Sequence, residues 1–201
     1  MSTTQDSVAS LKSSFTADKG LLVFDYDGTL AHLDVDWPGL RSALVAGAQD
    51  LGFVSTFRPL WGEMSRLRDE VGMDGVSALL KIVADYEQRG VARQRRRRDV
   101  EEFVRWAEAH AVDGERSVSF AIFSANLHAT VSAGLEALGL RSTFDWVVGA
   151  DDVTLWKPDA EGLIRLMKLA GCDASHTLFI GDGVADEAAA RQAHVDFVLV
   201  S

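Results

Sequence analysis

Phe24-Asp25-Tyr26-Asp27-Gly28-Thr29-Leu30 is the stretch that decides the fold of this chain. It closes the apolar run 21–24, which is typical of a short buried strand. Asp25 and Asp27 stand where this strand ends, and Gly28 permits a sharp turn of the backbone after them. Such acids are either surface carboxylates that bind nothing or ligands of a divalent cation, which prefers carboxylate oxygens. An aspartate can also attack phosphorus and carry the phosphoryl group covalently.

The composition is that of a globular protein in a reducing compartment. The 201 residues suffice for one domain, or for one core with a modest insertion, and 47% of them are hydrophobic. The formal net charge of -10 argues against nucleic acid or an anionic membrane as a partner. No apolar run reaches the length needed to span a bilayer. Cys172 is the single cysteine, so no internal disulfide is possible, and we expect a cytoplasmic protein.

The first 18 residues are rich in Ser and Thr and contain no apolar core like that of a signal peptide. We expect residues 1–18 to be poorly ordered. The helical spacing of Val8, Leu11 and Phe15 leaves one docked helical turn as the alternative.

A helical block follows, because from about residue 34 to about residue 98 the apolar residues recur at helical spacing and no strand is indicated. Pro38 is expected in the first turn of the first helix, and a further helix is expected from about residue 92 to 111. The first helix is marked by Leu40, Leu44 and Leu51, the second by Leu60, Met64, Leu67 and Val71, and the third by Val76, Leu79, Leu80, Val83 and Tyr86.

Four consecutive arginines, residues 95–98, stand at the start of that further helix. The favoured interpretation is a solvated helix face on which Arg97 pairs with Glu101 and Arg98 with Glu102, four residues apart. The alternatives are one arginine that contacts an anionic substrate and, less favoured, a nucleic-acid surface.

Beyond residue 114 the pattern changes to alternating strands and helices. Short apolar strands separated by helices predict a parallel sheet covered on both faces, an α/β fold. The expected strands are 118–123, 146–148, 178–180 and 197–200, and the expected helices are 127–138, 160–170 and 185–194.

Polar residues follow several of these strands, and ligands of open parallel sheets bind outside the carboxyl ends of the strands. We therefore predict a metal-assisted site for an anionic substrate at that edge. The residues concerned are Asp25 and Asp27, then Ser124-Ala125-Asn126, then Lys157, and finally Asp182 and Asp186.

These groups resemble, in order, the four motifs of the haloacid dehalogenase-like superfamily, with Ser124 in motif two, Lys157 in motif three, and Asp182 and Asp186 in motif four. The resemblance is to the phosphoglycolate phosphatase-like branch, which has a small helical cap. It implies a Rossmann-like three-layer core of residues 1–33 and 108–201 and an inserted cap of residues 34–107.

By this resemblance Asp25 is the nucleophile and Asp27 the general acid and base. Mg²⁺ would be held by Asp25, the backbone carbonyl of Asp27, Asp182 and Asp186. The groups that would hold the substrate phosphate belong to Asp25, Gly28, Thr29, Ser124, Ala125, Asn126 and Lys157.

The implied activity is Mg²⁺-dependent hydrolysis of a small phosphorylated metabolite through an aspartyl phosphate. By this resemblance Asp27 favours phosphatases and phosphomutases, because haloacid dehalogenases, phosphonatases and transport ATPases carry another residue at that position. A phosphomutase of the β-phosphoglucomutase type and a catalytically silent binding domain remain alternatives. Whether the protein is a monomer or a homodimer stays open.

Overall fold

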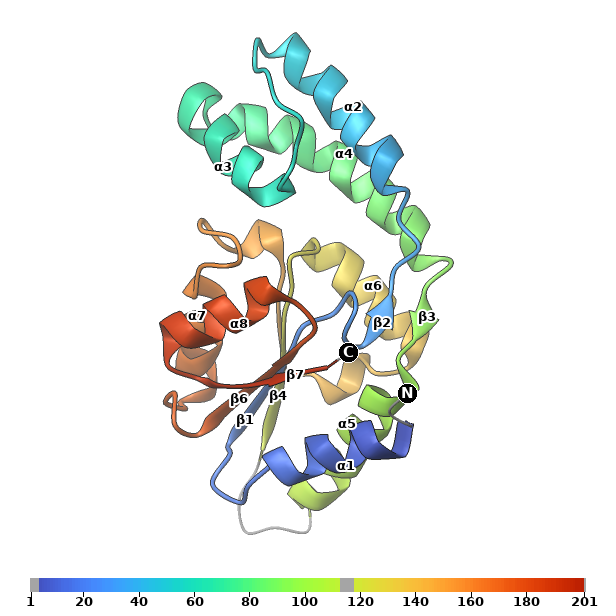
Figure 1. Ribbon diagram of the computed structural model, residues 1–201, viewed down its shortest axis with the longest axis vertical. Helices are drawn as coiled ribbons and strands as arrows, with labels where there is room; N and C mark the ends of the chain where they lie inside the picture. The colour runs from blue at the N-terminus through green and yellow to red at the C-terminus, as the bar shows by residue number, and fades with distance from the viewer. Residues whose placement is uncertain (1–3, 113–117, 201) are drawn as a thin grey trace. The chain divides into compact units, whose positions relative to one another are not determined.

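The computed structural model describes residues 4–112 and 118–200, and its central element is a five-stranded sheet in the order β5-β4-β1-β6-β7 (Figure 1). All neighbouring strands of this sheet are parallel, which confirms the predicted α/β fold. The strands are β1 (Leu21–Phe24), β4 (Ser119–Phe123), β5 (Trp146–Val148), β6 (Thr177–Gly181) and β7 (Asp196–Leu199).

Helices cover both faces of this sheet, and the alternation of side chains along β1 shows how. Leu21 and Val23 belong to one apolar cluster with α7 (Glu161–Ala170) and α8 (Val184–Ala193). Phe24 points to the opposite face, where its ring lies 6.2 Å from that of Phe103 in α5 (Arg98–Val112). Helix α6 (His128–Leu138) packs against β5. The result is the expected three-layer core, with every residue of β1 buried.

The chain divides into two compact units, one of residues up to 32 together with residues from 95 onward, the other of residues 33–94. This division differs from the predicted cap of residues 34–107, because residues 95–107 group with the sheet. The physical reason is α5, whose Phe103 packs against Phe24 and whose Trp106 ring lies 5.9 Å from that of Phe15.

The second unit consists of α2 (Trp37–Asp50), α3 (Leu60–Val71) and α4 (Met73–Val91). Asp36 caps α2, because its carboxylate accepts a hydrogen bond of 3.0 Å from the amide of Gly39, and Pro38 occupies the first turn as predicted. Most of the predicted apolar positions are buried, namely Leu40, Leu44, Met64, Leu67, Val76, Leu79 and Val83.

Two short strands join the first unit where the chain leaves it and returns. Strand β2 (Ala31–His32) pairs antiparallel with β3 (Arg95–Arg96), so that His32 lies opposite Arg95. The predictions of no strand between about residues 34 and 98 and of a helix from about residue 92 are therefore wrong, because β3 lies in that interval. Helix α5 begins only at Arg98, because residues 95 and 96 are used in this pair.

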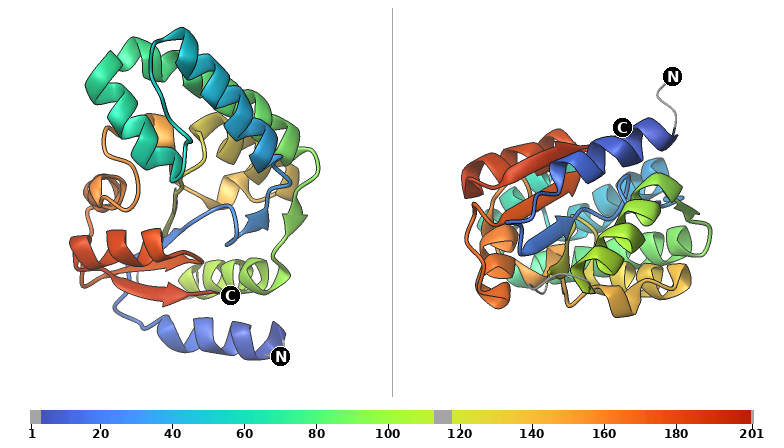
Figure 2. Two further views of the ribbon diagram at one scale, coloured as in Figure 1. Left: turned by 45° about the horizontal axis from the view of Figure 1, so that its top comes forward. Right: turned by 90° about the horizontal axis from the view of Figure 1, so that it is seen from below.

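The N-terminal segment forms helix α1 (Thr4–Ser14), which packs against α5 (Figure 2). Val8 and Leu11 are buried, so the structure has the docked helix that was the alternative to a poorly ordered segment; residues 1–3 lie outside the described part. The apolar spacing of this segment outweighed its Ser and Thr content. Across the described ranges, every helix is too short or too polar to cross a bilayer.

Candidate active site

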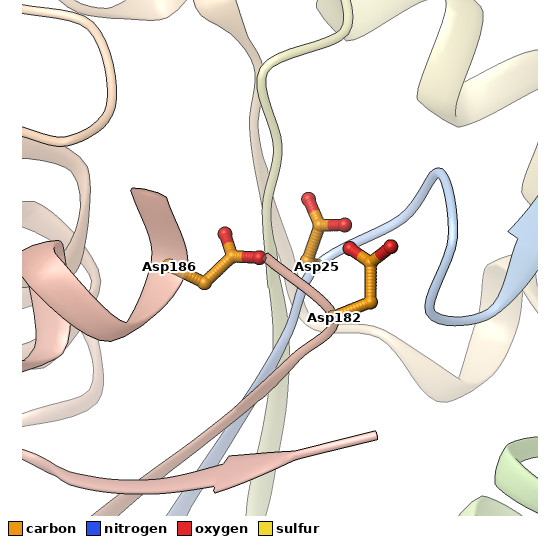
Figure 3. Close-up of side chains that lie close together, drawn as sticks. All are labelled: Asp25, Asp182 and Asp186. Carbon is orange, nitrogen blue, oxygen red and sulfur yellow. The ribbon is translucent and has the colours of Figure 1, made fainter. Parts of the chain in front are cut away.

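Three carboxylates meet at the carboxyl edge of the sheet (Figure 3). Asp25 follows β1, Asp182 follows β6 and Asp186 lies in the first turn of α8, and one oxygen of each lies within 4.8 Å of the others. Asp25 and Asp186 are buried, whereas Asp182 is exposed. The close-up shows their carboxyl groups gathered above the strand ends. Strands far apart in the sequence thus place three acids in one small volume.

Lys157 is the cation of this cluster. Its Nζ donates to Oδ1 of Asp25 at 2.8 Å and to Oδ1 of Asp186 at 2.6 Å, and its side chain is buried. The ammonium lies 4.6 Å from the centre of the Phe123 ring, a distance at which the ring face attracts a cation. Burial opposes its charge, but the carboxylates of Asp25 and Asp186 outweigh burial and raise the pKa of Lys157. The lysine therefore stays protonated.

One ammonium does not balance three carboxylates. Burial raises the pKa of Asp25 to about 7; the charge of Lys157 opposes this rise, and the charge of Asp186 adds to it. Loss of hydration and the neighbouring Asp186 likewise raise the pKa of Asp182. An excess of negative charge on convergent carboxylate oxygens is the donor set that a hard divalent cation prefers. The residues present thus fit a bound Mg²⁺.

The loop after β1 is shaped by Gly28, which has a φ of 93°. A Cβ atom at this position would lie 2.0 Å from Oδ2 of Asp182, so a larger residue would collide with the acidic cluster. The amides of Thr29, Leu30 and Ala31 all donate to the carbonyl of Tyr26, which closes the loop tightly. The Thr29 hydroxyl donates to Oδ2 of Asp25 at 3.4 Å. The sharp turn predicted at Gly28 is present.

Asp27 lies half-buried in this loop, two residues beyond Asp25. The carboxylate cluster found among the described residues is made of Asp25, Asp182 and Asp186 and does not include the Asp27 side chain.

Ser124 and Asn126 form a second loop at the same edge, after β4. Strands β1 and β4 are neighbours with Phe24 opposite Ile122, so the residues that follow both strands emerge side by side. The Ser124 hydroxyl donates to Oδ1 of Asn126 and accepts from the Asn126 amide, each at 3.1 Å. Both residues are buried, and Ala125 between them is half-buried. The hydroxyl is thus held in one orientation.

Arg97 lies at this edge, whereas the favoured interpretation of the sequence placed it on a solvated helix face. The expected pair of Arg97 with Glu101 is wrong: Glu101 accepts from Arg96 and Arg105 instead. The Arg97 guanidinium donates to the carbonyl of Gly28 at 2.8 Å and to Asp99. Residue spacing gave no signal for this contact, because its acceptor is a main-chain oxygen far away in the sequence.

Comparison with known proteins places this arrangement in context. Residues 75–200 match the family model of haloacid dehalogenase-like hydrolases. The chain is 30% identical over 197 residues to a phosphoglycolate phosphatase of Pseudomonas syringae pv. tomato, covering 90% of this chain and 69% of that protein. It is 32% identical over 190 residues to the Dickeya dadantii protein named "Probable phosphatase IndB", covering 87% of this chain and 78% of that protein.

A solved structure shares the fold at lower identity. A haloacid dehalogenase-like hydrolase from Bacteroides fragilis superposes with a TM-score of 0.65 at 19% identity, covering 91% of this chain and 88% of that one. At this identity the likeness concerns the fold alone.

Proposed function

This chain belongs to the haloacid dehalogenase-like hydrolase family and is a phosphatase, and on that premise we propose that it hydrolyses a small phosphate monoester through an aspartyl phosphate on Asp25. The observation that carries the proposal is the cluster of Asp25, Asp182 and Asp186, in which the Lys157 ammonium donates to Asp25 and Asp186. A buried carboxylate next to a fixed ammonium, with two further acids beside it, suits attack on an anionic phosphate assisted by a metal.

We assign the metal site to Asp25, Asp182 and Asp186, with the backbone carbonyl of Asp27 as a further ligand. A divalent cation bound there supplies positive charge that opposes protonation of Asp25 and offsets charge on the phosphate. Repulsion between two unit charges about 4 Å apart is roughly 4 kcal/mol at an effective dielectric of 20. Neutralising that repulsion is a large part of what the site has to supply.

In the proposed reaction an Asp25 oxygen attacks phosphorus, and the bond from phosphorus to the alcohol oxygen breaks. Asp27, protonated at that moment, gives its proton to the departing oxygen. Water then attacks phosphorus, its proton passes to Asp27, and the bond to Asp25 breaks, which releases inorganic phosphate. Asp27 suits this exchange because it lies in the same loop as Asp25, two residues further along the chain.

The transferred phosphoryl group needs donors that are already in place. We assign this role to the Lys157 ammonium, to the Ser124 hydroxyl and to backbone amides of the two loops that follow β1 and β4. The backbone amide of Asn126 donates to the Ser124 oxygen and fixes its position; to donate to the phosphoryl group, the hydroxyl proton turns from Oδ1 of Asn126 to the substrate. The loop residues concerned are Gly28, Thr29, Ala125 and Asn126.

Residues 33–94 form a separate helical unit, and we assign them the role of a cap that selects the leaving group. Relatives named phosphoglycolate phosphatase make 2-phosphoglycolate the leading candidate substrate. The partner is then a small phosphorylated metabolite.

The test is a screen of phosphate monoesters with Mg²⁺, and with EDTA in its place. We expect turnover only with the metal, and we expect Asp25→Asn to abolish it while the circular dichroism spectrum stays unchanged.

Asp27→Asn should retain Mg²⁺ binding and lose about 10²- to 10⁴-fold in kcat, the usual contribution of a general acid and base. Activity in Asp25→Asn, or metal-independent turnover, would refute the mechanism, and accumulation of a sugar bisphosphate would indicate a phosphomutase instead.

A further inference from the structure

Arg97 is held in place on both sides of its guanidinium. Nη1 donates to the Gly28 carbonyl at 2.8 Å, while Nε and Nη2 donate to the two oxygens of Asp99 at 3.2 and 2.9 Å. The side chains of Arg97 and Asp99 are only 11% and 13% exposed. The other arginines of the run, at positions 95, 96 and 98, are exposed. One member of the basic run is therefore built into the structure.

Asp99 fixes the plane of this guanidinium. Burial opposes ionisation of Asp99, but the hydrogen bonds and the charge of Arg97 outweigh it and lower the pKa of Asp99. Nε and Nη2 of the planar guanidinium bind the two carboxylate oxygens, and this fork fixes the direction of the remaining nitrogen, Nη1. Nη1 donates to the Gly28 carbonyl. A lysine has no such fork and could not make the three contacts together.

Gly28 lies between Nη1 of Arg97 and the acidic cluster. Its carbonyl faces Arg97, and its α-carbon lies so close to Asp182 that an added Cβ would come within 2.0 Å of a carboxylate oxygen. The preceding residue is Asp27, whose carbonyl we assign to the metal. The backbone conformation of Gly28 therefore links the carbonyl that Arg97 binds to the Asp27 peptide before it and to the space beside Asp182.

The place of Arg97 in the chain adds a second restraint. It follows β3 directly, and its backbone amide donates to the Leu30 carbonyl at 3.0 Å. Arg97, which follows residues 33–94 in the chain, thus donates hydrogen bonds to two carbonyls of the loop after β1, those of Gly28 and Leu30.

We propose that Arg97 is a positioning residue, held by Asp99, that keeps the loop of residues 26–31 in the conformation required for metal binding and phosphoryl transfer. Arg97 touches neither substrate nor metal in this role and acts through the Gly28 peptide. The proposal rests on the proposed function as regards metal and turnover. Its conformational part, the ordering of the loop, stands independently.

The experiment compares Arg97→Gln, Arg97→Lys and Asp99→Asn with Arg98→Gln, a matched control at an exposed arginine of the same run. Amide hydrogen exchange of peptides covering residues 26–31 is measured in EDTA, and Mg²⁺ binding is measured by calorimetry. We expect Arg97→Gln to speed exchange in this loop alone and to weaken Mg²⁺ binding and lower kcat by about 10- to 100-fold, the usual effect of removing a group that orients a metal ligand. Arg97→Lys should rescue little, Asp99→Asn should fall between Arg97→Gln and wild type, and Arg98→Gln should match wild type.

Equal loop exchange in Arg97→Gln and Arg98→Gln would overturn the proposal. So would faster exchange throughout the chain with a lower unfolding midpoint, because that pattern indicates a merely structural role. Rescue by Arg97→Lys would show that charge alone matters and would overturn the role of the fork. If the wild-type protein neither binds Mg²⁺ nor hydrolyses any ester, the proposed function fails, while exchange in the metal-free loop still decides whether Arg97 orders it.

Discussion

At the scale of single residues, Lys157 should be the most costly member of the cluster to remove. Its ammonium offsets two buried carboxylates, and breaking a buried ion pair leaves a charge without compensation. For Lys157→Met we expect the free energy of unfolding in EDTA to fall by about 3–5 kcal/mol. Urea denaturation measures the change, and Lys168→Met, at an exposed lysine, should stay within about 0.5 kcal/mol of wild type. Equal stability of the two variants would show that Lys157 is not the neutralising group.

The raised pKa of Asp25 makes a prediction about pH. Burial and the Asp186 charge raise this pKa to about 7, against an ordinary value of 3.8, so between these values the folded protein binds more protons than the unfolded chain. Stability linked to Asp25 is therefore fully present below pH 3.8 and is lost as the pH rises through about 7. In EDTA, the free energy of unfolding should fall from pH 5 to pH 8.

Asp25→Asn provides the control for this pH dependence, because an amide does not titrate. Its stability should change less over the same interval, and saturating Mg²⁺ should stabilise the wild-type protein most at the higher pH, where the carboxylates are ionised. The measurement is a series of urea denaturations with and without metal. Identical slopes for wild type and Asp25→Asn would assign the pH effect to another group.

Part of the candidate site could be predicted from residue types at strand ends. The carboxylates of Asp25, Asp182 and Asp186 and the ammonium of Lys157 do gather at one edge, because parallel strands deliver their carboxyl ends to the same side. Arg97 could not be predicted, since its contact depends on the direction of one peptide group and on the pairing of β2 with β3.

At the scale of elements, α1 should contribute to stability without contributing to chemistry. Leu11 is buried where α1 packs on α5, and replacing a buried leucine by alanine usually costs about 2–5 kcal/mol. We expect Leu11→Ala to lower the free energy of unfolding by an amount near the lower end of that range and to leave kcat unchanged. Ser10→Ala, at an exposed position of the same helix, is the control. A large fall in kcat for Leu11→Ala would instead connect α1 to the site.

Elements with many apolar residues were predicted well, and very short ones were not. The run 21–24 and the helix marked by Val76, Leu79 and Val83 contain enough buried apolar residues to be recognised from the sequence. Strands β2 and β3 have two residues each, and no period can be recognised over two residues. Because residues 95 and 96 form β3, α5 begins at Arg98, later than the predicted start near residue 92.

At the scale of the whole molecule, the parallel sheet could be predicted but its strand order could not. Alternating strands and helices require crossovers, and crossovers give parallel neighbours. Placing β1 in the middle, between β4 and β6, requires contacts between side chains far apart in the sequence. That central place matters for function, because the loop after β1 is then flanked by the loops after β4 and β6.

The division into two units makes the last prediction. Residues 33–94 leave from His32 and return at Arg95, and these two residues face each other in the β2–β3 pair. A two-residue Asn-Gly turn is the usual connection between antiparallel strands, so it should join His32 to Arg95 in place of residues 33–94. We expect the shortened chain to fold, with one cooperative urea transition, and to bind Mg²⁺ in calorimetry about as the full chain does.

Because the proposed cap is then absent, kcat/KM values for 2-phosphoglycolate and for p-nitrophenyl phosphate should become more alike. An unchanged ratio between these two substrates would place specificity in the sheet unit, and a chain that does not fold would show that residues 33–94 are required for stability.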